Sequence, residues 1–182
     1  MHREIEVKYR ARDANELWLA LHARGMEFSS VIRQDDQAYA ESGWQYGMSK
    51  VGRTFARLRT QDGRHIFTLK RPTVNEQACL EFETEVSDRE QMHQALVNMG
   101  FYPTVRIVKT RRTGSVGERL TVCVDEVEHA GVFLELEEMI GPGESGLAVQ
   151  ASLDTFARSL GIDLERTTET YDSLVRLAIV PA

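Results

Sequence analysis

Charged and apolar side chains alternate in residues 4–8, whose sequence is Glu-Ile-Glu-Val-Lys. Side chains alternate across a β-strand, so Glu4, Glu6 and Lys8 share one face and the apolar residues between them share the other. Carboxylate oxygens bind hard divalent cations, and an ammonium group binds phosphate oxygens. The strand either exposes its charges to water, as antiparallel sheets usually do, or belongs to a closed barrel that holds an ionic ligand.

The same alternation recurs in later segments, each of which has one charged and one apolar face. The charged positions are Arg57, Arg59, Lys70, Glu81, Glu83, Glu85, Lys109, Arg111, Asp125, Glu135 and Glu137. Acids dominate some segments and bases dominate others, whereas a solvated sheet usually interleaves the signs so that cross-strand pairs attract. Acidic and basic walls suit polyphosphate bound together with divalent cations. An open sheet packed on helices would also satisfy the alternation, so the residues alone leave both interpretations open.

A mainly antiparallel sheet must position these charges. The pattern predicts strands over 2–11, 28–40, 54–60, 64–71, 79–87, 102–113, 118–127 and 131–140. Asp62-Gly63 predicts a hairpin turn, and Asp13 and Asp88 are expected to cap helices over 14–25 and up to about residue 98. Further helices are expected over 148–160 and 168–178. About eight strands joined mostly as hairpins predict an α+β fold and are enough to close a barrel.

Length and composition favour one domain spanning residues 1–182. No apolar run is long enough to cross a bilayer, and nothing at the start resembles a signal peptide, so we expect no membrane partner. Cys79 and Cys123 match no metal-ligand spacing and are expected to be free thiols in a reducing cytoplasm. The formal net charge of −6 argues against a nucleic-acid partner.

Taken in order, the charged segments resemble the CYTH family, also called the triphosphate tunnel metalloenzymes. The family's Glu-x-Glu-x-Lys hallmark is similar to residues 4–8. Its later elements are similar to Arg57-Leu58-Arg59, Lys70-Arg71-Pro72, Glu81-Phe82-Glu83, Lys109-Thr110-Arg111, Asp125, Gly131-Val132-Phe133 and Glu135-Leu136-Glu137. Residues 170–174 resemble the family's C-terminal helix. The segment 35–40 matches the family pattern only loosely, and Arg71 stands where the family commonly has glycine.

The resemblance implies an eight-stranded antiparallel β-barrel with a charged interior, the triphosphate tunnel, and helices packed outside. It implies an enzyme that needs Mg²⁺ or Mn²⁺ to act on a triphosphate small molecule. The implied catalytic and phosphate-binding residues are Lys8, Arg57, Arg59, Lys70, Lys109 and Arg111, with Glu81 and Glu83 on the opposing wall of the substrate site. The implied metal ligands are Glu4, Glu6, Asp125, Glu135 and Glu137.

Two chemistries of the family compete, and the register of the substrate along the tunnel decides between them. The chain looks most like the class IV adenylate cyclases, lyases that direct the 3′-hydroxyl of ATP at the α-phosphorus and release pyrophosphate. The alternative is a triphosphatase, a hydrolase of inorganic, thiamine or nucleoside triphosphate. A non-catalytic nucleotide or polyphosphate sensor is a third interpretation, disfavoured because no metal carboxylate is missing. A barrel strand or the C-terminal helix could supply a homodimer contact.

Overall fold

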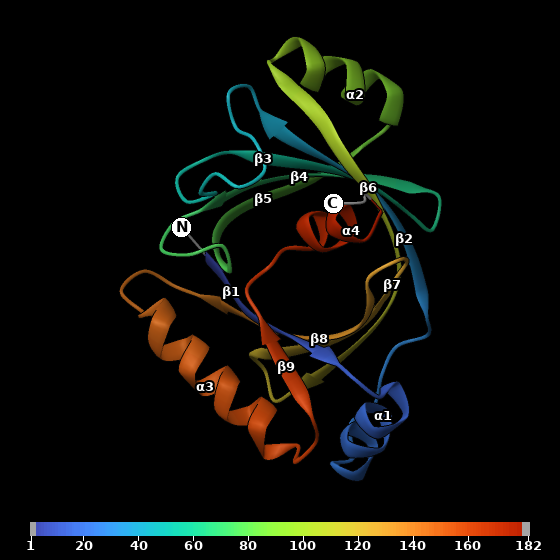
Figure 1. The fold of residues 1–182 in the computed structure, drawn as a ribbon, viewed down its shortest axis with the longest axis vertical. Coiled ribbons are helices and arrows are strands. Elements are labelled where there is room, and N and C mark those ends of the chain that lie inside the picture. The colour runs from blue at the N-terminus through green and yellow to red at the C-terminus, as the bar shows by residue number, and fades with distance from the viewer. Residues whose placement is uncertain (1–2, 180–182) are drawn as a thin grey trace.

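Eight antiparallel strands close into a barrel in the computed structural model, which describes residues 3–179 (Figure 1). Around the wall, β1 is followed by β5, β4, β3, β2, β6, β7 and β8, and β8 pairs with β1 again. The strands are β1 (Arg3–Ala11), β2 (Ile32–Glu41), β3 (Phe55–Gln61), β4 (Arg64–Pro72), β5 (Ala78–Val86), β6 (Phe101–Val116), β7 (Leu120–Val127) and β8 (Gly131–Ile140). The predicted eight-stranded antiparallel barrel is therefore confirmed.

A short additional strand, β9 (Leu164–Thr167), was not expected from the sequence. The first residues of β1 pair with β5, whereas residues 8–11 of β1 pair with β9. With only four residues, β9 is too short to show a reliable alternation, and it forms because β5 leaves one edge of β1 without a partner. The helix expected over 168–178 consequently begins later, at Tyr171.

Local signals in the sequence place the turns and helix starts as predicted. Asp62 and Gly63 have φ angles of 51° and 74°, the left-handed values that a two-residue turn between β3 and β4 requires. Asp13 accepts hydrogen bonds from the first turn of α1 (Ala14–Ala23), and Asp88 does so for α2 (Arg89–Asn98). The remaining helices are α3 (Gly146–Ser159) and α4 (Tyr171–Ile179). Among residues 3–179, no helix is both long and apolar enough to cross a membrane.

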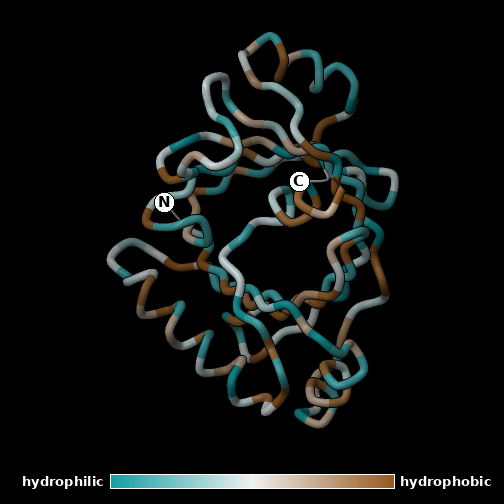
Figure 2. The backbone as a smooth tube through the Cα atoms, viewed as in Figure 1, coloured by the Kyte–Doolittle hydropathy of each residue, from teal (hydrophilic) through white to brown (hydrophobic). Residues whose placement is uncertain are grey.

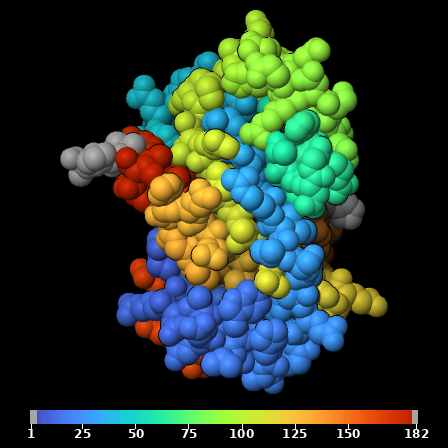
Figure 3. Space-filling model, turned by 90° about the vertical axis from the view of Figure 1, so that its right-hand side faces the viewer, coloured from blue at the N-terminus to red at the C-terminus, as the bar shows by residue number. Residues whose placement is uncertain are grey.

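The apolar face of the strands points outward and packs against helices. Ile5, Val7 and Leu136 are fully buried together with Leu17 of α1, and Leu153 of α3 belongs to the same cluster. A smaller cluster joins α2 to β2 and β3. Each fully buried aliphatic side chain contributes about 1.5–3 kcal/mol relative to exposure. Figure 2 shows hydrophilic and hydrophobic residues mixed along the wall, and Figure 3 shows β2 and β6 side by side between α2 and α1. This packing turns the charged face inward.

Helix α4 lies across one opening of the barrel (Figure 1). Its residue Val175 is buried against Val105, Ile107 and Phe133. The two β6 residues share strand parity with Lys109, and Phe133 shares it with Glu135, so this cluster lies on the inner face of the wall. The barrel interior is therefore charged along most of its length and apolar where α4 covers it.

Candidate functional site

The charged residues predicted from the sequence surround one cavity of about 300 Å³ inside the barrel, which we call the tunnel. Those that line it are Glu4, Glu6, Lys8, Arg57, Arg59, Lys70, Glu83, Lys109, Arg111, Glu135 and Glu137. Glu81 and Asp125 do not line the cavity but form ion pairs with the cations that do. Burial of charge is costly unless each group is paired, and the tunnel meets this requirement with an extensive ion-pair network.

Three carboxylates converge on one part of the tunnel. Glu6, Glu135 and Glu137 each offer an oxygen within 4.8 Å of the others, and we call them the acidic trio. The register of the β1–β8 ladder places Glu6 directly opposite Glu137 and Lys8 opposite Glu135. Burial, together with the neighbouring carboxylates, raises the pKa of Glu137 to about 7 in spite of the nearby Arg111. Closely spaced, hard oxygen donors of like charge fit a divalent cation such as Mg²⁺ or Mn²⁺.

Asp125 organises the cations beside the acidic trio. Its carboxylate, with no exposed surface, accepts from Lys109 Nζ at 2.5 Å and from Arg111 Nε and Nη2 at 2.7 Å each. Arg111 also pairs with Glu135, and its Nη1 lies 3.3 Å from Glu137. These ion pairs outweigh the effect of burial and lower the pKa of Asp125. In this arrangement Asp125 positions two phosphate-binding candidates, and it does not belong to the acidic trio.

A second group of charges lies on the adjoining part of the tunnel wall, formed by β1, β5, β4 and β3. Lys70 Nζ lies 3.1 Å from Glu4 and 2.7 Å from Glu81. Arg57 Nη2 lies 3.3 Å from Glu83 and donates to Thr68. Glu4, predicted as a metal ligand, therefore pairs with a cation of β4. Burial favours its neutral form, but Lys70 overcomes this effect and lowers the pKa of Glu4.

Asp36 also belongs to the tunnel, although it was not predicted as a site residue. Asp36 on β2 is 3% exposed and lines the cavity, where it accepts two hydrogen bonds from Arg59. Burial alone would raise its pKa, yet the bonds from Arg59 lower the pKa to about 2. The parity test applied to the strand expected at 28–40 could have found it, because Asp36 shares a face with Gln34 and Ala38.

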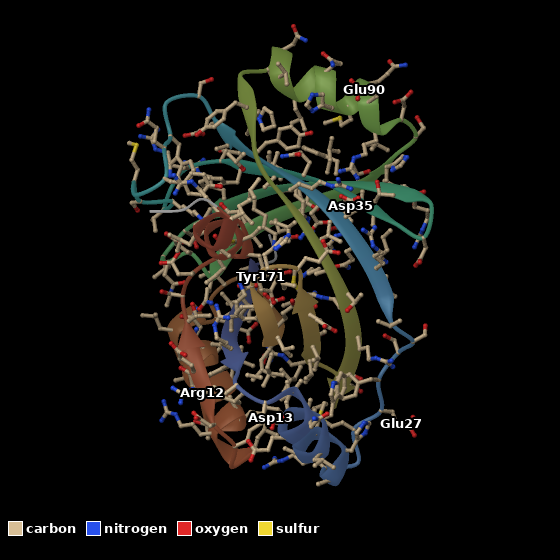
Figure 4. The ribbon with its side chains drawn as sticks, turned by 45° about the vertical axis from the view of Figure 1, so that its right-hand side comes forward. Arg12, Asp13, Glu27, Asp35, Glu90 and Tyr171 are labelled. Carbon is tan, nitrogen blue, oxygen red and sulfur yellow. The ribbon has the colours of Figure 1, made fainter. Side chains whose placement is uncertain are left out.

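Tyr171 and Lys50 also reach the tunnel and were not predicted as site residues. Tyr171 begins α4 and points toward the middle of the barrel (Figure 4). Lys50 belongs to the loop 42–54 between β2 and β3, and its side chain is 6% exposed. A lysine in a glycine-containing loop gives no periodic signal, and the position of Tyr171 depends on how α4 docks. Neither could have been placed from the sequence.

The comparisons with known proteins agree with this geometry. A family model described as the CYTH domain matches residues 2–171. A Methanocaldococcus jannaschii protein named "Putative adenylate cyclase MJ0240" is 29% identical over 139 residues, 75% of this chain and 77% of that protein.

Two solved structures have the same fold. The PH1012 protein from Pyrococcus horikoshii has a TM-score of 0.78 at 23% identity, covering 94% of this chain and 99% of that one. HpAC1 from Hippeastrum, described as a "putative adenylyl cyclase" that "reveals a dominant triphophatase activity", has a TM-score of 0.63 at 18% identity, covering 97% and 95%. At these identities the likeness shows the fold alone.

Proposed function

The chain belongs to the CYTH family, and on this premise we propose that it is a divalent-metal-dependent enzyme that hydrolyses a compact triphosphate in the tunnel. The observation that carries the proposal is the composition of the cavity wall. A linear triphosphate needs cations along its length and a metal site beside it. The tunnel offers Lys8, Arg57 and Lys70 together with the Lys109–Arg111 pair, and the acidic trio lies among them.

The acidic trio is the part of the chain best suited to hold the metal. Its carboxylate oxygens are the ligand type that Mg²⁺ and Mn²⁺ prefer, and Glu4, two residues from Glu6 on the same face of β1, is a further candidate ligand. When bound, a divalent cation would supply Lewis-acid neutralisation of phosphate oxygens. Occupation of the trio would also relieve the mutual repulsion that, together with burial, keeps the pKa of Glu137 near 7.

The side chains of the tunnel would bind the substrate and stabilise the charge that develops during cleavage. Water attacks a terminal phosphorus, the bond from that phosphorus to the bridging oxygen breaks, and phosphate and pyrophosphate leave. Lys8, Lys109 and Arg111 would hold phosphate oxygens near the acidic trio, while Arg57 and Lys70 would stabilise the other end of the chain. Glu81 and Asp125 would keep these cations in place through their ion pairs.

The size of the cavity is compatible with a compact triphosphate. About 300 Å³ lies at the lower end of the range of roughly 300–1,000 Å³ for pockets that bury drug-sized ligands. The triphosphatase activity described for HpAC1 is consistent with hydrolysis of such a compound.

Cyclisation of ATP is the second candidate. Phe55, Pro72 and Ile107 add an apolar section to the lining, which could contact a nucleoside. The name of the Methanocaldococcus relative points in the same direction.

Product analysis tests the proposal. The protein is incubated with inorganic tripolyphosphate or ATP under Mg²⁺ or Mn²⁺, and phosphate, pyrophosphate and cyclic AMP are quantified. We expect metal-dependent release of phosphate and pyrophosphate from tripolyphosphate, abolished by EDTA. Cyclic AMP with pyrophosphate as the main products of ATP would overturn hydrolysis in favour of cyclisation. Calorimetric binding of tripolyphosphate without turnover of either compound would overturn both and indicate a non-catalytic binding protein.

A further inference from the structure

Two cations of the tunnel contact the ring of Tyr171. Lys8 Nζ lies 4.2 Å from the ring centroid and Lys109 Nζ lies 4.5 Å from it. Phe133 meets the same ring edge-on, with centroids 5.2 Å apart. Cation–π contacts of this kind fix the ring position. Because both ammonium groups are candidates for binding phosphate, Tyr171 borders the phosphate-binding part of the tunnel and separates it from the apolar end covered by α4.

The hydroxyl group of Tyr171 makes no hydrogen bond that satisfies it in the described chain. Its oxygen is buried and has no hydrogen-bond partner within residues 3–179. Burial raises the pKa of this hydroxyl, and the nearby carboxylates of Glu135 and Asp125 raise it further, so Asp125 is the protein group that competes for its hydrogen. Both oxygens of Asp125 already accept hydrogen bonds from Lys109 and Arg111, which hold that carboxylate against β6. A buried hydroxyl without a partner is costly, and a ligand that accepts its hydrogen bond removes the cost. An oxygen of a bound phosphate is the acceptor that the neighbouring cations would bring there.

Lys50 forms hydrogen bonds with the residues on both sides of Tyr171. Its Nζ donates to Thr170 Oγ1, to the Asp172 carboxylate at 3.2 Å and to Ser173 Oγ at 3.1 Å. Its side chain is 6% exposed, so these bonds form away from bulk water. Lys50 therefore connects the loop between β2 and β3 to the start of α4, and a displacement of this loop would move Tyr171.

We propose that Tyr171 is the stop that sets the register of the phosphate chain in the tunnel, with its hydroxyl donating to the terminal phosphate, and that Lys50 is the positioning residue that holds the stop in place. The proposal rests on the proposed function, because the register matters only if the tunnel cleaves a phosphate chain. A fixed stop places one particular phosphorus beside the acidic trio. Without this stop, a phosphate chain would slide along the tunnel and place different phosphorus atoms beside the acidic trio.

The bond that is cleaved in inorganic linear tetraphosphate reports the register directly. Cleavage of an outer bond gives phosphate and tripolyphosphate, whereas cleavage of the central bond gives two pyrophosphates. Initial products are separated by ion chromatography for the wild type, Tyr171→Ala, Tyr171→Phe and Lys50→Met. We expect a single product pattern from the wild type and mixed patterns from Tyr171→Ala and Lys50→Met. Tyr171→Phe keeps the ring, so we expect the single pattern with a KM raised about tenfold or more, as for the loss of a hydrogen bond to a charged group.

Three further variants distinguish a loss of positioning from a general loss of folding. Lys50→Arg keeps a positive charge at this position, so it should keep the single product pattern of the wild type. Lys50→Met/Asp172→Asn removes both charges of one ion pair, so it should fold even if Lys50→Met does not, and it should give the mixed pattern. Arg119→Met removes a cation that pairs with Glu138 and Glu144 and does not line the tunnel, and it should match the wild type.

Unchanged product patterns in folded Tyr171→Ala and Lys50→Met/Asp172→Asn would overturn the register proposal. Absence of turnover of tripolyphosphate by the wild type would instead overturn the proposed function. In that case, calorimetric binding of tripolyphosphate still tests the hydroxyl contact, because Tyr171→Phe should bind about tenfold more weakly. Equal affinity of Tyr171→Phe and the wild type would overturn that contact.

Discussion

Asp36 and Arg59 form a two-pronged ion pair across β2 and β3. The Nε–Oδ1 and Nη2–Oδ2 distances are both 2.8 Å, and both residues are buried. Arg57 lies on the same face of β3, two positions away, but its buried Nε has no hydrogen-bond partner in the described chain. The two arginines of one Arg-x-Arg motif therefore differ: Arg59 is committed to a protein carboxylate, whereas Arg57 keeps a donor for a ligand.

This difference predicts that two matched substitutions affect different properties, one the activity and the other the stability. Arg57→Met should lower kcat/KM for tripolyphosphate by about 10²–10³, the usual effect of losing a donor that stabilises developing charge. Arg59→Met should chiefly lower the free energy of unfolding, by about 3–5 kcal/mol, because it leaves Asp36 charged, buried and unpaired. Steady-state kinetics and urea unfolding of both variants check the prediction. Equal losses of activity and stability in the two variants would contradict it.

The same ion pair predicts a pH dependence of stability. The pKa of Asp36 is about 2 in the folded protein and ordinarily 3.8. A lowered folded-state pKa stabilises the fold above the unfolded value and loses this contribution as the pH falls through about 4 toward 2. The difference corresponds to about 2 kcal/mol. Urea unfolding between pH 6 and pH 3 should show the stability gap between the wild type and Asp36→Asn/Arg59→Met shrinking below about pH 4. A gap that does not change with pH would refute this assignment.

Removal of one carboxylate from the acidic trio should weaken metal binding. Glu137→Gln preserves volume but removes a negative charge, so the Kd for Mn²⁺ should rise at least about tenfold, since even outer-shell partners of metal ligands contribute 10–100-fold. Glu126→Gln is the matched control, because Glu126 is exposed and lies on the opposite face of β7 from Asp125. Calorimetric titration with Mn²⁺ checks both. Wild-type affinity in Glu137→Gln would remove this residue from the metal site.

Substitution of Asp125 should weaken substrate binding more than metal binding, in contrast to substitution of the acidic trio. Asp125→Asn leaves Lys109 and Arg111 without their shared carboxylate, so these cations should lose their positions and the KM for tripolyphosphate should rise about tenfold or more. The Kd for Mn²⁺ should change less than it does in Glu137→Gln. Measurement of the KM for tripolyphosphate and the Kd for Mn²⁺ in both variants tests this assignment of roles. A larger loss of metal affinity in Asp125→Asn would return Asp125 to the metal ligands.

Strand parity in the sequence was sufficient to place the charged residues on one face of the sheet. Glu4, Glu6 and Lys8 share a face because side chains alternate along any strand, whatever surrounds it. The hairpin at Asp62-Gly63 and the cap at Asp13 were equally predictable, since each depends on only a few neighbouring residues. The expected homodimer and cytoplasmic location stay predictions.

Only the tertiary structure decided which charges meet. Glu6 and Glu137 come together because the β1–β8 register places them opposite each other across more than a hundred residues of sequence. Glu4 instead pairs with Lys70 of β4, on the other side of β1. The docking of α4 brings the ring of Tyr171 against Lys8 and Lys109. The sequence thus determined the kinds of groups inside the barrel, because local alternation is a property of one strand. Their pairing depended on register and barrel closure, which involve strands and a helix distant in the chain.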